Sequence, residues 1–307
     1  MREKNILLLG GGGFIGSALA RCLRKKKFNV HILSRQFHSQ QIDSNIIFHQ
    51  GSLDNRKIIE RVLPECQTII HLASSTTPGS SSRQPSLEAD KNITPTLHFL
   101  DILQSFKNIH IIFVSSGGTL YGNPESTPVN ETQPLNPLSF HGAGKVAIET
   151  FLRTFSNFPE NTTTVVRPSN VYGPEQPIRS GFGVIRTMLE HIRKGTVMEI
   201  WGNGTSVRDF LYIDDMLSAM IQLINLPRDN NTYNVGSGIG YSLNQLKEIV
   251  ESVCGKKLDV IYRPSRKTDV NTIVLDSSRL IKKTKWYPAV SLEQGIELTW
   301  KWLKKHQ

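Results

Sequence analysis

Two residues that can handle protons, His141 and Lys145, stand four positions apart in the stretch SFHGAGK (139–145). On a helix, positions i and i+4 lie on the same face, so both side chains would point in the same direction. Imidazole changes its charge near neutral pH and is a frequent general base. A lone histidine on a helix is more often structural, so the case for chemistry depends on the elements around this pair.

A glycine-rich turn, GGGGFIG (10–16), follows the apolar run NILLLG (5–10) and opens a segment with helical periodicity. Glycines let such a turn bend tightly and let a pyrophosphate approach the backbone, while the N-terminus of the helix favours an anion. The spacing fits a dinucleotide-binding fingerprint whether its first glycine is Gly10 or Gly11. We therefore expect a dinucleotide to contact Gly10, Gly13, Phe14, Ile15 and Gly16.

The end of the second apolar run (29–34) bears on which dinucleotide binds. An acid at this point would bind the adenosine ribose and repel a 2′-phosphate. The chain instead reads LSRQ, with Ser34 followed by Arg35 and with no acid before Asp43. A hydroxyl and a guanidinium suit a 2′-phosphate, so the sequence favours NADP and leaves NAD as the alternative.

Short apolar runs alternate with helical patterns through the first half of the chain. This alternation predicts an α/β fold, a doubly wound parallel sheet covered on both faces, with a smaller C-terminal α/β lobe. The predicted strands are 5–10, 29–34, 45–51, 68–74, 108–116 and 162–169, and the predicted helices are 14–27, 55–64, 86–106 and 144–156.

The domain division follows from where this pattern loosens, after Pro174. We expect a dinucleotide-binding domain over 1–173, to which 209–236 returns, and a substrate-binding lobe over 174–307. Polar loops at 74–86 and 122–137 follow the fourth and fifth strands. They would lie at the carboxyl edge of the sheet, where ligands bind in open α/β folds.

The net charge is +10, with 36 Lys and Arg residues against 26 Asp and Glu. These cations are dispersed, apart from 21–27 and the C-terminal tail, so we interpret them as solvated helix ends and expect no nucleic-acid partner. No apolar run has the length of a membrane span or the form of a secretion signal, so we expect no membrane insertion and a cytoplasmic location. The cysteines Cys22, Cys66 and Cys254 are widely spaced and predict no metal site.

A set of motifs occurs in a familiar order along the whole chain: the glycine turn, HLAS (71–74), VSSGGTLYG (114–122), GAGK (142–145), RPSNVYGP (167–174) and IWGNGTSVRDFLYIDD (200–215). The chain closely resembles the extended short-chain dehydrogenase/reductases, in particular the NAD(P)-dependent nucleotide-sugar epimerases and dehydratases. The resemblance implies a Rossmann domain, a C-terminal lobe that grips a nucleoside-diphosphate sugar, and a homodimer formed through two long helices.

In that family a tyrosine and a lysine stand four apart on a helix, beside a serine or threonine from the loop after the fifth strand. Lys145 matches the lysine, which the family uses to bind the nicotinamide ribose and to lower the pKa of the tyrosine. His141 occupies the tyrosine position, and Gly117 occupies the serine or threonine position. Two of the three expected groups are therefore changed.

Three interpretations of His141 remain open. It can be the base itself, since the charge of Lys145 favours the neutral imidazole, although histidine is shorter than tyrosine and the sugar would have to lie closer. The site can instead bind its ligands and turn over slowly. In the third interpretation Ser116, Thr119 or Tyr121 does part of the work.

The resemblance also implies contacts for both ligands. Arg208 and Arg266 match arginines that hold the diphosphate, where a planar guanidinium fits well. Asn170 matches an asparagine that touches the sugar diphosphate, and Asp269 would orient its neighbours or the nucleotide ribose. Besides the glycine turn and Ser34–Arg35, the expected dinucleotide contacts are Ser52, Leu53, Leu72, Ala73, Asn92 and Lys145.

The leading functional hypothesis is a nucleotide-sugar epimerase that oxidises a sugar carbon, C4 being favoured, and reduces it again on the other face. An NADPH-dependent keto-sugar reductase is the first alternative, favoured by Ser34 and Arg35. A nucleotide-sugar or dinucleotide binding protein with impaired catalysis is the second, motivated by Gly117 and His141. A dehydratase is disfavoured, because the loop SSGGT has no acidic pair to eliminate water.

Overall fold

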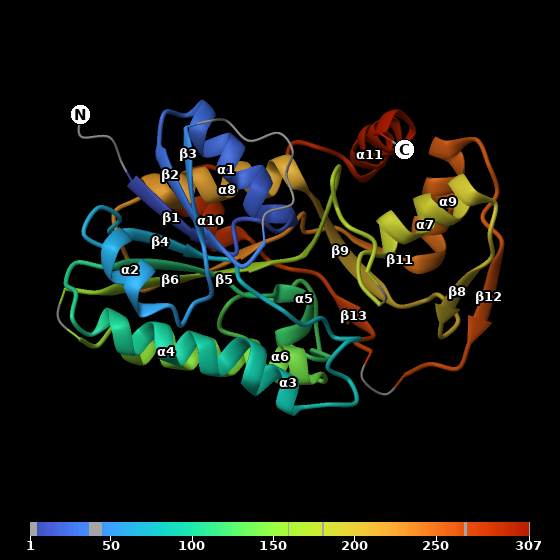
Figure 1. Ribbon diagram of the computed structural model, residues 1–307. Coiled ribbons are helices and arrows are strands. Elements are labelled where there is room, and N and C mark those ends of the chain that lie inside the picture. Colours follow the sequence, from blue (N-terminus) through green and yellow to red (C-terminus); the bar gives the residue numbers. More distant parts are fainter. Residues whose placement is uncertain (1–4, 37–44, 159, 180, 267–268, 307) are drawn as a thin grey trace.

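The computed structural model describes residues 5–36, 45–158, 160–179, 181–266 and 269–306. The chain forms a larger part around a parallel sheet and a smaller part that contains the helices α7, α9 and α11 (Figure 1). Within the described ranges, no helix is long and apolar enough to cross a membrane.

The seven-stranded sheet of the larger part is parallel throughout and has the order β10-β6-β5-β4-β1-β2-β3. From β3 to β6 this is the strand order of a doubly wound dinucleotide-binding fold. The predicted fold class and six of the strands are thus confirmed, and β10 is a seventh strand that the sequence analysis did not identify. The strands are β1 (Asn5–Leu9), β2 (Asn29–Ser34), β3 (Ile46–Gln50), β4 (Thr68–His71), β5 (His110–Val114), β6 (Thr162–Pro168) and β10 (Thr232–Val235).

Helices cover both faces of this sheet. Successive side chains of a strand point to opposite faces, so each strand contributes to two separate apolar cores. In β1, Ile6 and Leu8 join one apolar core, and Leu7 and Leu9 join a second. The first core lies under α1 (Phe14–Lys25) and α8 (Ile213–Asn225), and the second lies under α2 (Arg56–Val62), α4 (Thr94–Leu103) and α6 (Phe140–Phe155) (Figure 1).

The helix that carries the candidate pair starts earlier than the sequence analysis predicted. We predicted 144–156, whereas α6 begins at Phe140. Ser139 is its N-cap, and its hydroxyl accepts a hydrogen bond from the Gly142 amide at 3.1 Å. His141 therefore lies in the first turn of the same helix as Lys145.

The predicted helix 86–106 is divided into three pieces. A short turn, α3 (Ser86–Glu88), continues as a π-helical segment, η1 (Ala89–Ile93), before α4 begins at Thr94. Pro95 stands in the first turn of α4, where its missing N–H costs nothing. Segments of π-helix are rare and often accompany functional sites, and this one carries Asn92 close to Glu88.

The smaller part contains two further sheets. One joins β7 (Asn170–Tyr172), β9 (Val207–Tyr212), β11 (Gly240–Ser242) and β13 (Thr272–Ile273), and the other pairs β8 (Met198–Trp201) with β12 (Val260–Arg263). The helices α7 (Val184–Lys194), α9 (Leu243–Cys254) and α11 (Leu292–His306) pack beside them (Figure 1).

Segments from the C-terminal half return to the large sheet, with different bounds from the predicted 209–236. The strand β9, which includes residues 209–212, belongs to the smaller part. The returning elements are α8, β10 and also α10 (Ser278–Thr284), which packs on β10.

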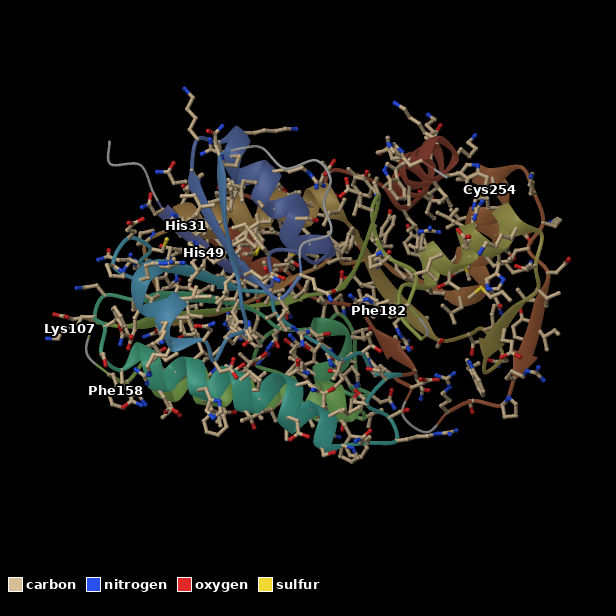
Figure 2. The ribbon with its side chains drawn as sticks, viewed as in Figure 1. His31, His49, Lys107, Phe158, Phe182 and Cys254 are labelled. Carbon is tan, nitrogen blue, oxygen red and sulfur yellow. The ribbon has the colours of Figure 1, made fainter. Side chains whose placement is uncertain are left out.

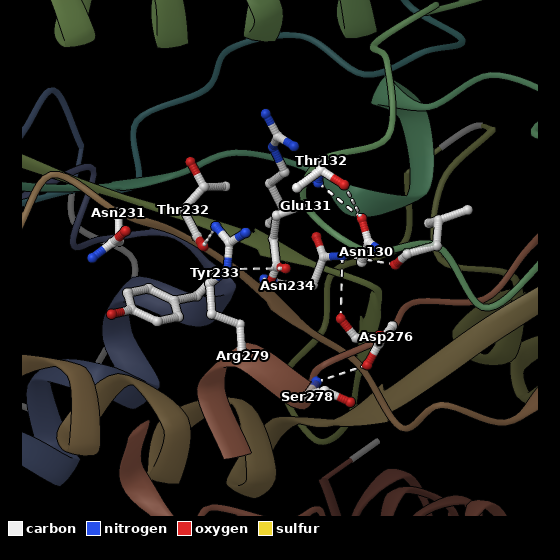
Figure 3. A network of polar contacts seen from close by, with 12 residues as sticks. Asn130, Glu131, Thr132, Asn231, Thr232, Tyr233, Asn234, Asp276, Ser278 and Arg279 are labelled. Carbon is white, nitrogen blue, oxygen red and sulfur yellow. Dashed lines mark hydrogen bonds and ion pairs between the residues drawn. The ribbon is translucent and has the colours of Figure 1, made fainter. Parts of the chain in front are cut away.

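A polar network connects β10 and α10 to the loop that follows β5 and the short helix α5 (Gly117–Leu120) (Figure 3). The Asn234 amide donates to Glu131 Oε1 at 2.9 Å, and its side chain donates to the Val129 carbonyl at 2.9 Å. Arg279 lies 3.4 Å from Glu131 Oε2 and donates to the Thr232 carbonyl at 3.1 Å. This loop is therefore anchored to the returning strand β10.

A buried ion pair fixes α6 against β6. Arg167 donates to both carboxylate oxygens of Glu149, at 3.1 and 2.6 Å, and both residues are 1% exposed. Burial alone would lower the pKa of Arg167, but the bonds to Glu149 raise it well above its ordinary value. Since Glu149 is one turn after Lys145, this bidentate pair helps set the position of the candidate site.

Candidate active site

A cavity of about 1460 Å³ extends from the glycine turn of the larger part to the sheets of the smaller part. Phe182, one of its lining residues, lies between the two parts (Figure 2). Most of the candidate site residues named from the sequence line this cavity, Tyr121 being an exception, although lining alone does not assign a role. These residues are Gly10, Gly13, Phe14, Ile15, Gly16, Ser34, Arg35, Ser52, Leu53, Leu72, Ala73, Asn92, Ser116, Thr119, His141, Lys145, Asn170, Arg208, Arg266 and Asp269.

The glycine turn is packed against its neighbours too closely for side chains at Gly10 and Gly16. Gly10 has a φ of +76°, and a Cβ there would lie 2.7 Å from the Ala73 Cα. A Cβ at Gly16 would lie 2.7 Å from the Gly10 carbonyl oxygen, so helix α1 meets the turn closely. Gly13 caps α1 without a side-chain bond, and no acid lies in the first turn. The turn therefore fits the pyrophosphate of a dinucleotide.

The end of the cavity near Ser34, Arg35 and Ser52, where we expect the adenosine, is polar and contains a cation. Ser34 Oγ donates to the Gln36 carbonyl at 2.8 Å, and Arg35 Nη2 donates to Ser75 Oγ at 3.0 Å. Ser52 is hydrogen-bonded to Asp54, whose pKa this bond lowers. Asp43 lies outside the described residues.

Lys145 is 6% exposed and lines the cavity. Its Nζ donates to the Val114 carbonyl at 3.2 Å and stands 4.9 Å from the centre of the Phe113 ring. Burial lowers the pKa of Lys145 to about 8, against the opposing charges of Glu88 and Glu149. A buried lysine with a lowered pKa at a cavity wall is a candidate functional group.

His141 faces a buried acid that the sequence analysis missed. Its Nδ1 lies 3.1 Å from Thr76 Oγ1 and 3.4 Å from Glu88 Oε1, and both neighbours are buried. Burial would raise the pKa of Glu88, but the polar side chains of His141, Thr76, Asn92 and Ser81 around it together lower that pKa to about 2. The polar loop 74–86 was expected at this edge, but nothing in the sequence placed a carboxylate from α3 beside His141.

Gly117 is packed closely, so a serine in the family's usual place would have to displace a neighbouring side chain. A Cβ at Gly117 would lie 2.5 Å from Leu275 Cδ1 and 3.0 Å from the Arg167 carbonyl oxygen. Other hydroxyls line the cavity nearby. Among the described residues, Ser115, Thr119 and Ser169 each have a buried hydroxyl oxygen without a hydrogen-bond partner, as expected of groups that bind a ligand.

Tyr121, which we had considered as a helper to the base, is not part of the cavity. Its side chain is 2% exposed, and its hydroxyl donates to Asn234 Oδ1 at 2.7 Å and accepts from Arg167 Nη1 at 2.9 Å. Burial raises its pKa. That interpretation was wrong for Tyr121, because the phenol belongs to the core network that anchors β10.

The far end of the cavity carries two guanidinium groups. Arg208 Nη1 donates to the carbonyls of Val207 and Asn271, at 2.9 and 3.3 Å, and burial lowers its pKa against the charge of Asp269. The Arg266 guanidinium lies 3.9 Å from the centre of the Trp201 ring. Asn170 Nδ2 donates to the Asp209 carbonyl at 2.9 Å, which orients this side chain at the cavity wall.

A phosphate cradle at β1–α1, a proton-handling pair on α6 and a cationic distal end thus share one cavity. These features, on a parallel sheet of this strand order, define an extended short-chain dehydrogenase/reductase.

Comparisons with known proteins specify the class further. A model of the "NAD dependent epimerase/dehydratase family" matches residues 6–236. A putative UDP-glucose 4-epimerase of Methanocaldococcus jannaschii is 30% identical, covering 98% of this chain and 99% of its own. A dTDP-4-dehydro-6-deoxyglucose reductase of Escherichia coli is also 30% identical, over 96% of each chain.

The structure of UDP-glucose 4-epimerase from Thermotoga maritima, solved with UDP-glucose, is similar with a TM-score of 0.92 and 32% identity. It covers 98% of this chain and 99% of its own. The chain belongs to the NAD dependent epimerase/dehydratase family, as its motifs predicted.

Proposed function

We propose that the protein is an NAD(P)-dependent epimerase that inverts C4 of a nucleoside-diphosphate sugar, with His141 as the base. The observation that carries the proposal is the position of His141 and Lys145. They lie one helical turn apart on α6 and line the same cavity, between the glycine turn and the two arginines. The names of the M. jannaschii and T. maritima relatives support this activity and a UDP-sugar substrate.

In this proposal each side chain has a defined task. His141 takes the proton of the C4 hydroxyl, and Thr119 and Ser116 hydrogen-bond to the sugar near that hydroxyl. Lys145 holds the nicotinamide ribose, and its charge favours loss of the hydroxyl proton. Arg208, Arg266 and Asn170 hold the diphosphate and the sugar, with Asp269 orienting the arginines. A nicotinamide dinucleotide held by the glycine turn and Lys145 would supply reversible hydride transfer at C4.

The dinucleotide would extend along the predicted contacts, from the glycine turn to Ser52, Leu53, Leu72, Ala73 and Asn92. At its adenosine end we favour NADP over NAD, because Arg35 lines the cavity there and Ser34 lies beside it. The phosphate would compete with Ser75 for the Arg35 guanidinium.

Proton NMR of UDP-glucose incubated with the purified protein tests the proposal. With a substoichiometric amount of NADP or NAD, we expect signals of UDP-galactose to grow to an equilibrium mixture. The same assay is run with UDP-glucuronate and with UDP-N-acetylglucosamine. Binding of these sugars without turnover of any of them would favour a binding protein with impaired catalysis.

The second candidate function is an NADPH-dependent reductase of a nucleotide keto-sugar. It is favoured by Arg35 and by the name of the E. coli relative. A reductase consumes one NADPH per sugar, whereas an epimerase recycles its dinucleotide. Stoichiometric loss of NADPH absorbance with a nucleotide 4-keto sugar, together with no epimerisation, would select the reductase. The homodimer, the cytoplasmic location and the domain division at 173 stay predictions.

A further inference from the structure

We propose that Glu88 is a positioning residue for His141: its carboxylate holds the imidazole with a proton on Nδ1 and so leaves Nε2 to take the proton of the sugar hydroxyl. The inference deepens the proposed function and rests on it. It assigns a task to a buried acid from α3 that faces the tyrosine-replacing residue of α6.

The first support is the burial of the carboxylate. Glu88 is 4% exposed, and its Oε2 accepts a hydrogen bond from Asn92 Nδ2 at 2.7 Å. Its Oε1 has no hydrogen-bond partner among the described residues, and the nitrogen that faces it is His141 Nδ1 at 3.4 Å. A buried, unsatisfied carboxylate oxygen costs free energy unless a donor faces it, so an N–H on Nδ1 is the arrangement that satisfies this pair.

The second support is the orientation of the neighbouring amide and hydroxyl. Asn92 Oδ1 accepts from the Ser75 amide at 2.8 Å, and its Nδ2 donates to both Glu88 and Thr76. Thr76 Oγ1 accepts a hydrogen bond from Asn92 Nδ2 and has a second lone pair that can accept one from His141 Nδ1, 3.1 Å away. An N–H on Nδ1 can therefore donate to Thr76 and Glu88 together, in agreement with the tautomer proposed above.

The third support is the room that α6 leaves for the carboxylate. A Cβ at Gly144 would lie 2.9 Å from Glu88 Oε2, so any larger residue would push the acid out of place. Gly144 thus allows the carboxylate of Glu88 to approach the helix between His141 and Lys145. The π-helical turn η1 places Asn92 where it can bind the other oxygen of the acid.

The chemical consequence concerns the charge that forms on the imidazole. If the hydroxyl proton moves to Nε2 while an oxidised nicotinamide would take the C4 hydride, the sugar alcohol would become a ketone and His141 an imidazolium. Lys145 opposes this positive charge and Glu88 offsets it. Glu88 keeps its own charge throughout, since it accepts a hydrogen bond and takes no proton. A histidine can in this way replace a tyrosine beside a cationic lysine.

The direct test is ¹⁵N NMR of the protein labelled at histidine, with His141 assigned from the His141→Gln variant. We expect the wild type to carry its proton on Nδ1 at neutral pH, with an unprotonated Nε2. Glu88→Gln should abolish this preference, whereas Asp90→Asn, which removes an exposed acid of the same segment, should leave it unchanged. A wild-type His141 protonated on Nε2 would overturn the proposal.

Kinetics supply the second test, with UDP-glucose as the probe. We expect Glu88→Gln to lower kcat by about 10- to 100-fold, by analogy with carboxylates that orient metal-bound histidines, and to move the acid limb of the pH profile. KM and the dinucleotide affinity should be retained. Gly144→Ala should also lower kcat, because it displaces the Glu88 carboxylate, whereas Asp90→Asn should leave kcat unchanged.

A double-mutant cycle distinguishes an effect of Glu88 on His141 from an effect on Lys145, because the charge of Glu88 also raises the pKa of Lys145. In the His141→Ala background, Glu88→Gln should cost no further activity. A full additional loss in that background would mean that Glu88 acts through Lys145, and would overturn the proposal. If the wild type epimerises no UDP-sugar, the proposed function fails, whereas the tautomer measurement still decides the role of Glu88.

Discussion

Gly117 lies directly against Leu275, and a Cβ at this glycine would come within 2.5 Å of Leu275 Cδ1. We therefore predict that Gly117→Ser, which restores the residue type usual in the family, lowers stability by about 1–3 kcal/mol, as overpacking generally does, and gains no activity. Urea unfolding measures the loss. In the Leu275→Ala background the serine should cost less than in the wild type, because its contact is gone. An equally large cost in both backgrounds would show that Leu275 is not the obstacle.

Lys145→Met should remove activity and stabilise the protein without ligands. Burial lowers the pKa of Lys145 from 10.5 to about 8, which corresponds to a cost of up to roughly 3 kcal/mol for keeping the charge in the folded state. The unfolded chain binds more protons than the folded one between about pH 8 and 10.5, so this cost is fully present below pH 8 and is relieved as the pH rises.

Chemical unfolding at several pH values tests the sign of this effect. The free energy of unfolding of Lys145→Met should exceed that of the wild type most at pH 7, and this difference should shrink toward pH 10.5. A gap that grows with pH would contradict the account of Lys145.

Arg35→Ala should weaken the binding of NADP by about 10- to 100-fold, the range expected for a lost hydrogen bond to a charged group, and should leave NAD binding unchanged. Isothermal calorimetry measures both. Arg56→Ala is the matched control, since Arg56 is an exposed arginine paired with Glu60 on α2, away from the cavity. Equal losses for NAD and NADP would contradict the assignment of Arg35 to the 2′-phosphate.

Glu149→Ala should lower the free energy of unfolding by about 3–5 kcal/mol, because it leaves the Arg167 charge buried without its partner. Thermal unfolding followed by circular dichroism gives the change. The double variant Glu149→Leu with Arg167→Met should lose much less, since no unpaired charge remains. If the single variant were as stable as the wild type, the pair would not hold α6 in place.

The sequence was most informative where local pattern decides structure. Apolar runs such as 5–10 and 29–34 became strands of the large sheet, and the glycine turn lies at the start of α1 as expected. The helix 86–106 was predicted without its π-helical turn, because the periodicity of side chains does not register one inserted residue.

Features that depend on distant segments could not be predicted. Glu88 meets His141 only because α3 and α6 pack together, and Tyr121 is buried by β10, a strand from the other half of the chain. The return of α10 to the sheet and the obstruction of Gly117 by Leu275 have the same origin. Such contacts come from tertiary packing and leave no mark in local spacing.

The most direct test of the central claim compares wild type with His141→Ala in the UDP-glucose epimerisation assay, with dinucleotide and UDP-sugar binding measured on the same samples. We predict unchanged binding and a fall in kcat of about 10²- to 10⁴-fold, the usual contribution of a general base. A His141→Ala variant that binds both ligands and turns over at the wild-type rate would contradict the account.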